Sequence, residues 1–268
     1  MLNKIISKVL VLSLPYDVRR KEHIINHFRT HGITEYEFVD AISHYSPLVK
    51  DMYLSGRVKT YPSCFRCGLD SCNCENNAII PQQVANWLSF KKVWELVASA
   101  DGPILVCEDD VFFYPKGIIL LNRWIDNNFV STEESPELIR LAHSGLSTDV
   151  SLHSLESLDI TDNQVMSNAA HIITPVLAQK MLAMFDRIET TSDIWIHKTV
   201  PELTGVKATT LAPLIATELS FNKLYAKFPS NIHPKGIDKE DEKRRMEHRM
   251  RFASSEDYES WFDGYSRR

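Results

Sequence analysis

Three consecutive carboxylates, Glu108, Asp109 and Asp110, stand directly after the apolar run Ile104–Cys107. In α/β sheets ligands bind outside the carboxyl ends of strands, so acids at this point face a crevice. Carboxylates this close repel one another unless a cation neutralises them, and their oxygens suit Mn²⁺ or Mg²⁺. Because alternate side chains of an extended segment share a face, Glu108 and Asp110 are expected to point one way and Asp109 the other. A solvated turn whose acids cap the next helix is the alternative.

Four of the five cysteines lie within eleven residues, namely Cys64, Cys67, Cys72 and Cys74. Such spacing lets four thiolates converge on one tetrahedral ion, and structural Zn²⁺ is the predicted occupant. Free thiols or two disulfides are the alternatives. The fifth cysteine, Cys107, stands alone, and an odd count without a secretory signal indicates a reducing compartment. A cytoplasmic location is therefore expected.

Short β-rich runs alternate with helical patterns, which is the signature of an α/β sheet with crossover helices. The expected strands are Val9–Leu14, Tyr36–Ala41, Ile104–Cys107, Leu138–Leu141, Ala170–Ile173 and Lys207–Leu211. The expected helices are Val18–Thr30 after a cap at Asp17, Pro81–Ala98 and Pro175–Phe185. These elements must position the acids.

The composition is that of a globular protein, with 44% hydrophobic and 24% charged residues among 268. A formal net charge of −5 lacks the basic footprint of a nucleic-acid binder, so no nucleic-acid partner is expected. No Pro/Gly/Ser-rich linker divides the chain, which favours one large domain over residues 1–235. Residues 61–80 form a Cys-rich insertion within it.

The C-terminal residues 236–268 are dense in both charge signs and are expected to form a charged helical extension. A solvated helix face is one interpretation, and an arm that contacts a membrane surface or a partner is the other. No run of about 18 apolar residues occurs, so no transmembrane segment is expected.

Several segments resemble glycosyltransferase family 25, in the order in which the family carries them. The family's helix and the strand that ends in Glu-Asp-Asp resemble PQQVANWLSFKKVWELVASADGPILVCEDDVFFYP. The family's opening strand and Arg-containing helix start resemble VLSLPYDVRRKEHIINHF, and its second strand resembles FVDAI. A later strand and helix of the family resemble SNAAHIITPVLAQKMLAMF, and the Asp that follows them resembles that of SDIWIH. The chain has Ser89-Phe90 where the family usually has Ser-His, and Gln83 where it often has Glu. Members include bacterial lipooligosaccharide galactosyltransferases and collagen galactosyltransferase domains.

The resemblance implies a GT-A fold, a Rossmann-like mixed sheet flanked by helices that binds a nucleotide sugar through a metal ion and its diphosphate. It places Asp110 as the metal ligand, with Glu108 nearby, and inversion at the anomeric carbon. Glu108 and Asp109 are also assigned to the donor site.

The end of the first strand and the start of its helix are expected to hold uracil and diphosphate through Leu14, Pro15 and Arg19. Guanidinium geometry allows Arg19 to pair with phosphate through two hydrogen bonds. A solvated helix start is the alternative for Arg19 and Arg20.

Inversion needs a base for the acceptor hydroxyl, and Asp193 matches the Asp that follows the family's later helix. A helix N-cap for Ile194–Val200 is the other interpretation of Asp193. His197 and His233 are candidates for a further metal ligand.

The predicted function is a metal-dependent inverting glycosyltransferase that moves a hexose, with galactose as the first choice, from a UDP-sugar to a glycan or glycoconjugate acceptor. The bacterial members point to lipopolysaccharide biosynthesis. A non-catalytic binding module that uses the cysteine cluster to recognise RNA or protein is one alternative. A metal-dependent phosphoryl-transfer enzyme is another.

Overall fold

The computed structural model describes residues 2–65, 67–69, 78–128, 137–143, 155–220, 228 and 230–232. Cys72, Cys74, His233 and the predicted extension at 236–268 lie outside the described residues. The chain forms two compact units. The first unit is Met1–Ala41, Phe90–Met184 and Asp193–Phe228, and the second is Ile42–Ser89, Phe185–Ser192 and Pro229–Arg268.

A seven-stranded mixed sheet forms the centre of the first unit, with the strand order β2-β1-β3-β8-β5-β9-β7. Its strands are β1 (Lys8–Ser13), β2 (Glu37–Asp40), β3 (Ile104–Glu108), β5 (Leu138–Arg140), β7 (Asp159–Thr161), β8 (Ala170–Ile173) and β9 (Ala208–Ala212). β8 runs antiparallel to β3 and β5, and β7 runs antiparallel to β9, whereas β1 is parallel to β2 and β3. All six expected strands are present, and the predicted mixed α/β sheet flanked by helices is confirmed.

A second, three-stranded sheet was not expected from the sequence. It has the order β4-β10-β6 and consists of β4 (Val111–Phe113), β6 (Ala142–His143) and β10 (Ala216–Glu218). β4 follows β3 after the two residues Asp109 and Asp110, and it runs antiparallel to β10. The small sheet therefore continues the chain directly from the acidic residues.

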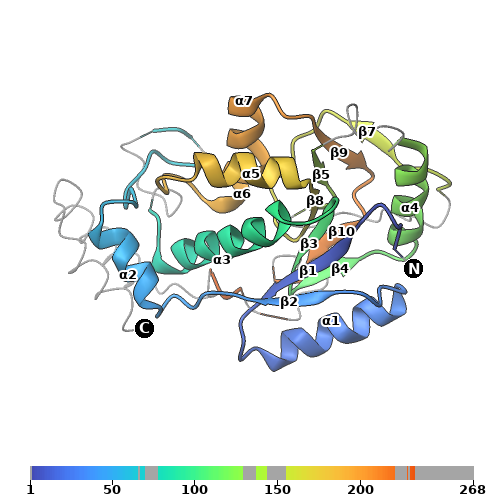
Figure 1. Cartoon of the computed structure of the whole chain (residues 1–268), viewed down its shortest axis with the longest axis horizontal. Helices are drawn as coiled ribbons and strands as arrows, with labels where there is room; N and C mark the ends of the chain where they lie inside the picture. The colour runs from blue at the N-terminus through green and yellow to red at the C-terminus, as the bar shows by residue number, and fades with distance from the viewer. Residues whose placement is uncertain are drawn as a thin grey trace. The chain divides into compact units, whose positions relative to one another are not determined.

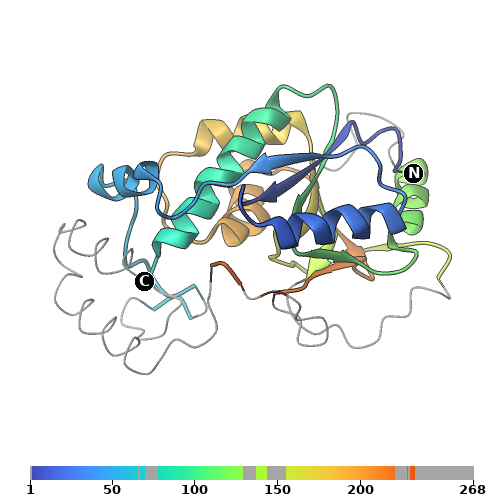
Figure 2. The same ribbon diagram turned by 90° about the horizontal axis from the view of Figure 1, so that it is seen from below.

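Helices cover both faces of the seven-stranded sheet (Figure 1). On one face Val9, Val11 and Leu105 share a buried cluster with α1 (Val18–Thr30) and α4 (Gly117–Asn128). On the other face Phe90 of α3 (Pro81–Ala98) packs against His171 of β8, with ring centroids 6.1 Å apart. Figure 2 shows the same arrangement from the α1 side. The alternation of side chains along β1 and β3 thus assigns each residue to a helix layer.

The start of α1 follows from its sequence. The Asp17 side chain accepts a hydrogen bond from the backbone N–H of Arg20 at 3.2 Å, and the helix covers the expected range Val18–Thr30. This cap fixes the direction in which the first turn of α1 leaves β1.

Three short helical segments follow α5 (Pro175–Met184), namely α6 (Ser192–Ile194), the π-helix η3 (Trp195–Thr199) and α7 (Val200–Thr204). Trp195 stacks on Trp94 with ring centroids 5.3 Å apart, and both side chains are buried. These tryptophans are core residues.

The second unit contains α2 (Pro47–Leu54) and the first half of α3. Gln83, which stands where the family often has Glu, accepts a hydrogen bond from the Ile80 N–H at 2.9 Å and so caps the start of α3. Ser89 accepts from the Ile42 N–H at 2.8 Å. Both side chains act within the framework of this unit.

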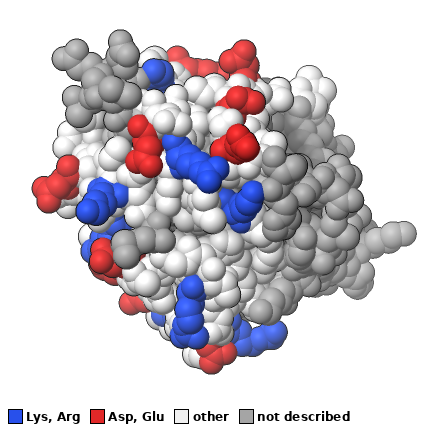
Figure 3. Space-filling view, turned by 90° about the vertical axis from the view of Figure 1, so that its right-hand side faces the viewer, with Lys and Arg blue, Asp and Glu red and all other residues white. Residues whose placement is uncertain are grey.

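On the face drawn in Figure 3, positive and negative side chains of the described residues are interspersed. Neither sign forms a continuous patch there. Across the helices that the structure describes, none is both long enough and apolar enough to cross a membrane.

Candidate active site

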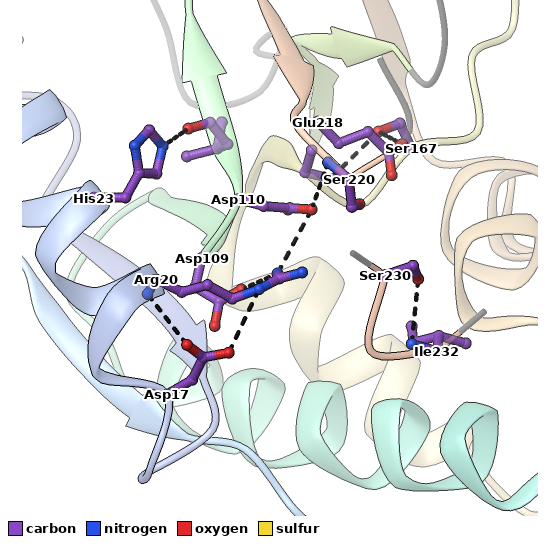
Figure 4. Close-up of polar contacts among 12 residues, drawn as sticks. Asp17, Arg20, His23, Asp109, Asp110, Ser167, Glu218, Ser220, Ser230 and Ile232 are labelled. Atoms are coloured by element: carbon purple, nitrogen blue, oxygen red, sulfur yellow. Dashed lines mark hydrogen bonds and ion pairs between the residues drawn. The ribbon is translucent and has the colours of Figure 1, made fainter. Parts of the chain in front are cut away.

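The turn between β3 and β4 carries Asp109 and Asp110, and both are buried. Asp109 lies on the α1 side of the sheet, where its Oδ1 is 2.6 Å from Arg20 Nη1. The same guanidinium nitrogen is 3.6 Å from Asp110 Oδ2, and Arg20 Nε is 3.5 Å from Asp17 Oδ2 (Figure 4). Arg20 therefore joins the cap of α1 to the acidic turn.

Asp110 also contacts the segment that follows β10. The Leu219 N–H donates to the Asp110 carbonyl at 2.9 Å, and the Ser220 N–H donates to Asp110 Oδ2 at 3.3 Å. Within the ladder itself, Glu218 is paired with Val111. β10 thereby brings a further carboxylate, Glu218, beside the acidic turn.

Four carboxylates of the first unit act on one another electrostatically, and we term Glu108, Asp110, Glu218 and Asp193 the carboxylate group. Burial raises the pKa of Glu108 well above its ordinary value, and the neighbouring acids raise it further. Burial likewise raises the pKa of Glu218 to about 8, and the charge of Asp110 adds to this shift. A 3.1 Å hydrogen bond from Ser167 Oγ opposes it, because it stabilises the ionised carboxylate. Like charges crowd this site, and a cation would relieve their repulsion.

Asp109 behaves differently because Arg20 faces it. Burial raises the pKa of Asp109 to about 6, although the Arg20 charge and hydrogen bond oppose the shift. Burial alone would lower the pKa of Arg20, but Asp109 and Asp110 raise it above its ordinary value. The pair is a buried ion pair that holds the turn.

The residues expected to hold the nucleotide stand together at the end of β1 and the start of α1. Leu14 is half-buried, whereas Pro15 and Arg19 are exposed. The Arg19 guanidinium carbon lies 5.7 Å from the centre of the Phe228 ring. Arg20 is not part of a solvated helix start, because it is buried against the acidic turn.

Asp193 lies inside α6 and is not the residue before it, and its side chain is half-buried. It contributes to the raised pKa of both Glu108 and Glu218. The structure therefore brings Asp193 near residues that are far away in the sequence.

Two members of this site, Arg20 and Glu218, were not assigned to it from the sequence. Arg20 had a signal, since it stands one helical turn after the capping Asp17 on the side of the sheet toward which Asp109 points. Glu218 had none, because a lone acid in a three-residue strand has no informative pattern.

A second set of ionisable groups is buried on β5, β8 and η3, and we term Arg140, His171 and His197 the buried basic cluster. Arg140 Nη1 donates to Thr210 Oγ1 at 3.3 Å and its Nη2 donates to the His197 carbonyl. The two imidazoles meet edge to face, with ring centroids 5.1 Å apart. His197 thus packs in the interior of the first unit, and the expectation that it serves as a metal ligand gains no support.

Burial governs this cluster as well. It lowers the pKa of Arg140, lowers the pKa of His171 to about 4, and lowers that of His197 well below its ordinary value. Among the described residues no carboxylate is paired with Arg140.

The carboxylate group has the donor chemistry of a hard divalent cation, since each member offers oxygen ligands. Within the described ranges, however, no three His, Cys, Asp or Glu side chains are arranged closely enough to hold a metal ion. The residue types fit Mn²⁺ or Mg²⁺, and the side chains would have to close around it.

The predicted zinc site belongs to the second unit. Cys64 is buried and Cys67 is exposed. The Gly68 N–H donates to the Cys64 carbonyl at 2.8 Å, and Gly68 adopts a φ of +71°, which favours glycine. A tight turn thus joins the two described cysteines.

The fold and the site define an α/β protein with a carboxylate group at the carboxyl end of a central strand. A sequence model of glycosyltransferase family 25, described as an LPS biosynthesis protein family, matches residues 6–196, which is more than half of the chain. The chain belongs to glycosyltransferase family 25.

Comparison with solved structures finds distant similarity of fold. The chain is similar to an inositol-1-phosphate CTP transferase from T. maritima, with 11% identity, a TM-score of 0.41 and coverage of 81% of this chain and 90% of that one. It is also similar to a glycosyltransferase involved in the glycosylation of the major capsid of PBCV-1, with 9% identity, a TM-score of 0.36 and coverage of 90% and 98%. No curated protein sequence matches the chain.

Proposed function

We propose that the chain is a metal-dependent, inverting glycosyltransferase that moves a hexose, with galactose as the first choice, from a UDP-sugar to a glycan or glycoconjugate acceptor in lipopolysaccharide biosynthesis. Family membership supports glycosyl transfer. The finer proposal rests on one observation, the convergence of the carboxylate group at the carboxyl end of β3. Such a concentration of negative charge suits a cation that in turn binds a diphosphate.

Asp110 and Glu108 are the residues proposed to hold the cation. Burial and then the charge of Asp110 raise the pKa of the half-buried Glu108, and a divalent charge would relieve the repulsion between the two carboxylates. When bound, Mn²⁺ or Mg²⁺ would stabilise the negative charge that develops on the leaving diphosphate. Asp109 supports the donor site through its contact with Arg20, which keeps the turn in place.

The nucleotide is proposed to lie against Leu14, Pro15 and Arg19. Leu14 and Pro15 follow the carboxyl end of β1 and Arg19 stands in the first turn of α1, and β1 lies next to β3 in the sheet. Nucleotides bind at this edge of α/β sheets. The exposed Arg19 keeps its donors available for phosphate oxygens.

Asp193 is proposed as the base. The acceptor hydroxyl oxygen attacks the anomeric carbon, the bond from that carbon to the phosphate oxygen breaks, and UDP leaves with the bonding electron pair. The hydroxyl proton passes to Asp193. Its half-buried side chain next to Glu108 and Glu218 supports this role, because a neighbouring negative charge favours proton acceptance.

A thermal-shift series with UDP-galactose, UDP-glucose and UDP, each with and without Mn²⁺, tests the proposal. A donor should raise the melting temperature only when Mn²⁺ is present, because ligand binding to the folded state adds stability. Slow release of UDP from the donor should follow. Release of a nucleoside monophosphate would favour phosphoryl transfer, and neither a shift nor any release would favour a non-catalytic binding module.

We also propose that Cys64, Cys67, Cys72 and Cys74 hold one structural Zn²⁺. The backbone turn that the Gly68 N–H closes on the Cys64 carbonyl supports the proposal, because it places Cys64 and Cys67 within a single turn of the chain. Metal analysis of protein purified under reducing conditions should give one zinc per chain. Absence of both zinc and iron would contradict the proposal. A cytoplasmic location is proposed on the cysteine usage alone.

A further inference from the structure

The strand that follows the acidic turn has one edge without a strand partner among the described residues. On its other edge β4 pairs with β10. Beside β4, the Asp110 carbonyl accepts from the Leu219 N–H and the Tyr114 N–H donates to the Ile215 carbonyl. In an antiparallel ladder the backbone groups of alternate residues point outward, here those of Val111 and Phe113. Both residues are fully buried, so these outward groups need partners.

Imidazoles of α1 supply those partners. His23 Nε2 lies 3.0 Å from the Val111 carbonyl, and the Phe113 N–H donates to His27 Nε2 at 2.8 Å. Burial lowers the pKa of His31, and a hydrogen bond with the Phe113 backbone partly offsets this shift. Two side chains of α1 therefore bond the outer edge of β4, and His31, the C-cap residue of the helix, interacts with the backbone of Phe113.

The spacing explains why a helix can do this. His23, His27 and His31 stand four residues apart, and four helical residues rise about 6 Å. Two residues of an antiparallel strand advance about 6.8 Å, so His23 and His27 meet the successive outward-facing residues Val111 and Phe113. The rings also stack, with centroids 5.3 Å apart for His23 and His27 and 4.8 Å apart for His27 and Phe112.

The same helix face begins with Arg20, which binds the turn just before β4. From Arg20 to His27, α1 contacts Asp109, Asp110, Val111 and Phe113 in chain order. Figure 4 shows His23 and Arg20 pointing from α1 toward this segment. A shift of β4 would also move Glu218, because Val111 and Glu218 are paired.

We propose that His23 and His27 are positioning residues that hold the Asp109–Asp110 turn, and with it the carboxylate group, in its reactive arrangement. The inference rests on the proposed function, since it takes these carboxylates as the centre of the reaction. The histidines act through the backbone of β4 and touch neither donor nor acceptor.

The contacts assign opposite tautomers. A carbonyl only accepts, so His23 carries its proton on Nε2, whereas His27 Nε2 accepts and its proton lies on Nδ1. Imidazole ¹⁵N chemical shifts of the whole chain at neutral pH should show this difference. A proton on Nε2 of His27 would overturn the proposed contact.

Two variants separate positioning from mere packing. His27→Gln keeps an acceptor near the position of Nε2, whereas His27→Leu fills much of the ring's space without one. The kcat of Mn²⁺-dependent UDP-sugar hydrolysis should fall about 10- to 100-fold in His27→Leu, because small misplacements of reacting groups are costly. His27→Gln should restore most of the rate, and Glu22→Leu elsewhere on α1 is the control.

The measurements are made well below the melting temperature of each variant. A purely structural role would lower the melting temperature and leave kcat unchanged, which would overturn the inference. If His27→Leu does not fold, His23→Gln and His23→Leu decide by the same comparison. Absence of turnover in the unmodified chain would overturn the proposed function instead, and amide exchange of residues 110–113 in the His27 pair would then decide whether the imidazole holds the turn.

Discussion

The carboxylate group and the buried basic cluster both gather ionisable side chains of the first unit. Burial raises the pKa of Glu108 and Glu218 in the first and lowers the pKa of Arg140, His171 and His197 in the second. Acids take up protons more readily, as the pKa of about 8 for Glu218 indicates. Bases release them more readily, as the pKa of about 4 for His171 indicates. In both cases the shift of the pKa favours the neutral form of the side chain, because a low-dielectric interior penalises charge.

Exposure separates the two regions. His171 and His197 are fully buried, so neither a ligand nor solvent reaches them directly. Glu108 and Asp193 are half-buried and remain accessible. The same penalty on charge therefore favours neutral imidazoles at His171 and His197 and, in the other region, leaves a set of acids whose repulsion a cation can relieve. We expect functional loss from changes in the carboxylate group and effects on stability from changes in the buried basic cluster.

The largest effect is expected for Asp110→Asn, which removes one charge from the proposed metal site and keeps the shape of the side chain. Transfer should fall about 10⁴-fold, because a metal ion supplies several kcal/mol of charge stabilisation. Calorimetry of UDP binding with and without Mn²⁺ should show that binding loses its metal dependence. Unchanged metal-dependent binding would place the active site elsewhere.

Asp109→Asn is the matched comparison at the neighbouring position. It leaves Arg20 buried without its closest charged partner, and such a change costs about 3 to 5 kcal/mol. The melting temperature should therefore drop, while UDP binding stays dependent on Mn²⁺. Loss of the metal dependence in this variant instead of Asp110→Asn would reverse the two assignments.

Asp193→Asn should keep UDP binding and lower turnover by about 10²- to 10⁴-fold, since a base acts in the chemical step. Binding by calorimetry and turnover by UDP release separate the two quantities. A loss below tenfold would leave Asp193 without the role of base.

Much of the framework could be predicted from the sequence because the signals are local. Asp17 caps α1, Pro81 opens α3, and apolar runs mark the six strands. β4 and β10 were missed, since strands of three residues are too short to show alternation, and β5, which is equally short, was found only through the apolar residues around it. α4 was not predicted either, although it is a twelve-residue helix with one buried side.

The residues of the candidate site likewise fall into those that the sequence predicts and those that only the tertiary structure brings together. Glu108, Asp109 and Asp110 could be predicted, because three acids after an apolar run are visible in the chain itself. The contribution of Glu218 depends on β10 pairing with β4, which only the tertiary structure creates. The four-residue spacing of His23 and His27 was visible, but its partner is a backbone edge that no side-chain pattern marks.

Glu218→Gln should change the pH dependence of stability in the metal-free protein. Between the ordinary pKa of 4.5 and about 8, the folded state binds more protons at Glu218 than the unfolded state, so stability falls as pH rises through this range. The variant should flatten that fall, as measured by urea unfolding at several pH values. Saturating Mn²⁺ should flatten it too in the unmodified chain, because a cation favours the ionised carboxylate. A pH dependence identical in variant and unmodified chain would contradict the shift.

The smallest effect is expected for His171→Gln, and it concerns the stability of the fold at acid pH. The pKa of His171 falls from 6.5 to about 4 on folding, so between these values the unfolded state binds more protons and stability is lost as pH falls. The variant should reduce this loss but not remove it, because the pKa of His197 is also lowered by burial. Urea unfolding between pH 4 and 6.5 measures the difference. Glu218→Gln is the comparison, because its effect on the slope has the opposite sign and continues up to about pH 8. Mn²⁺-dependent UDP binding should stay unchanged in folded His171→Gln, since the buried basic cluster supports the sheet and does not contact the donor. Loss of that binding would join the two regions into one functional site and would end the distinction between them.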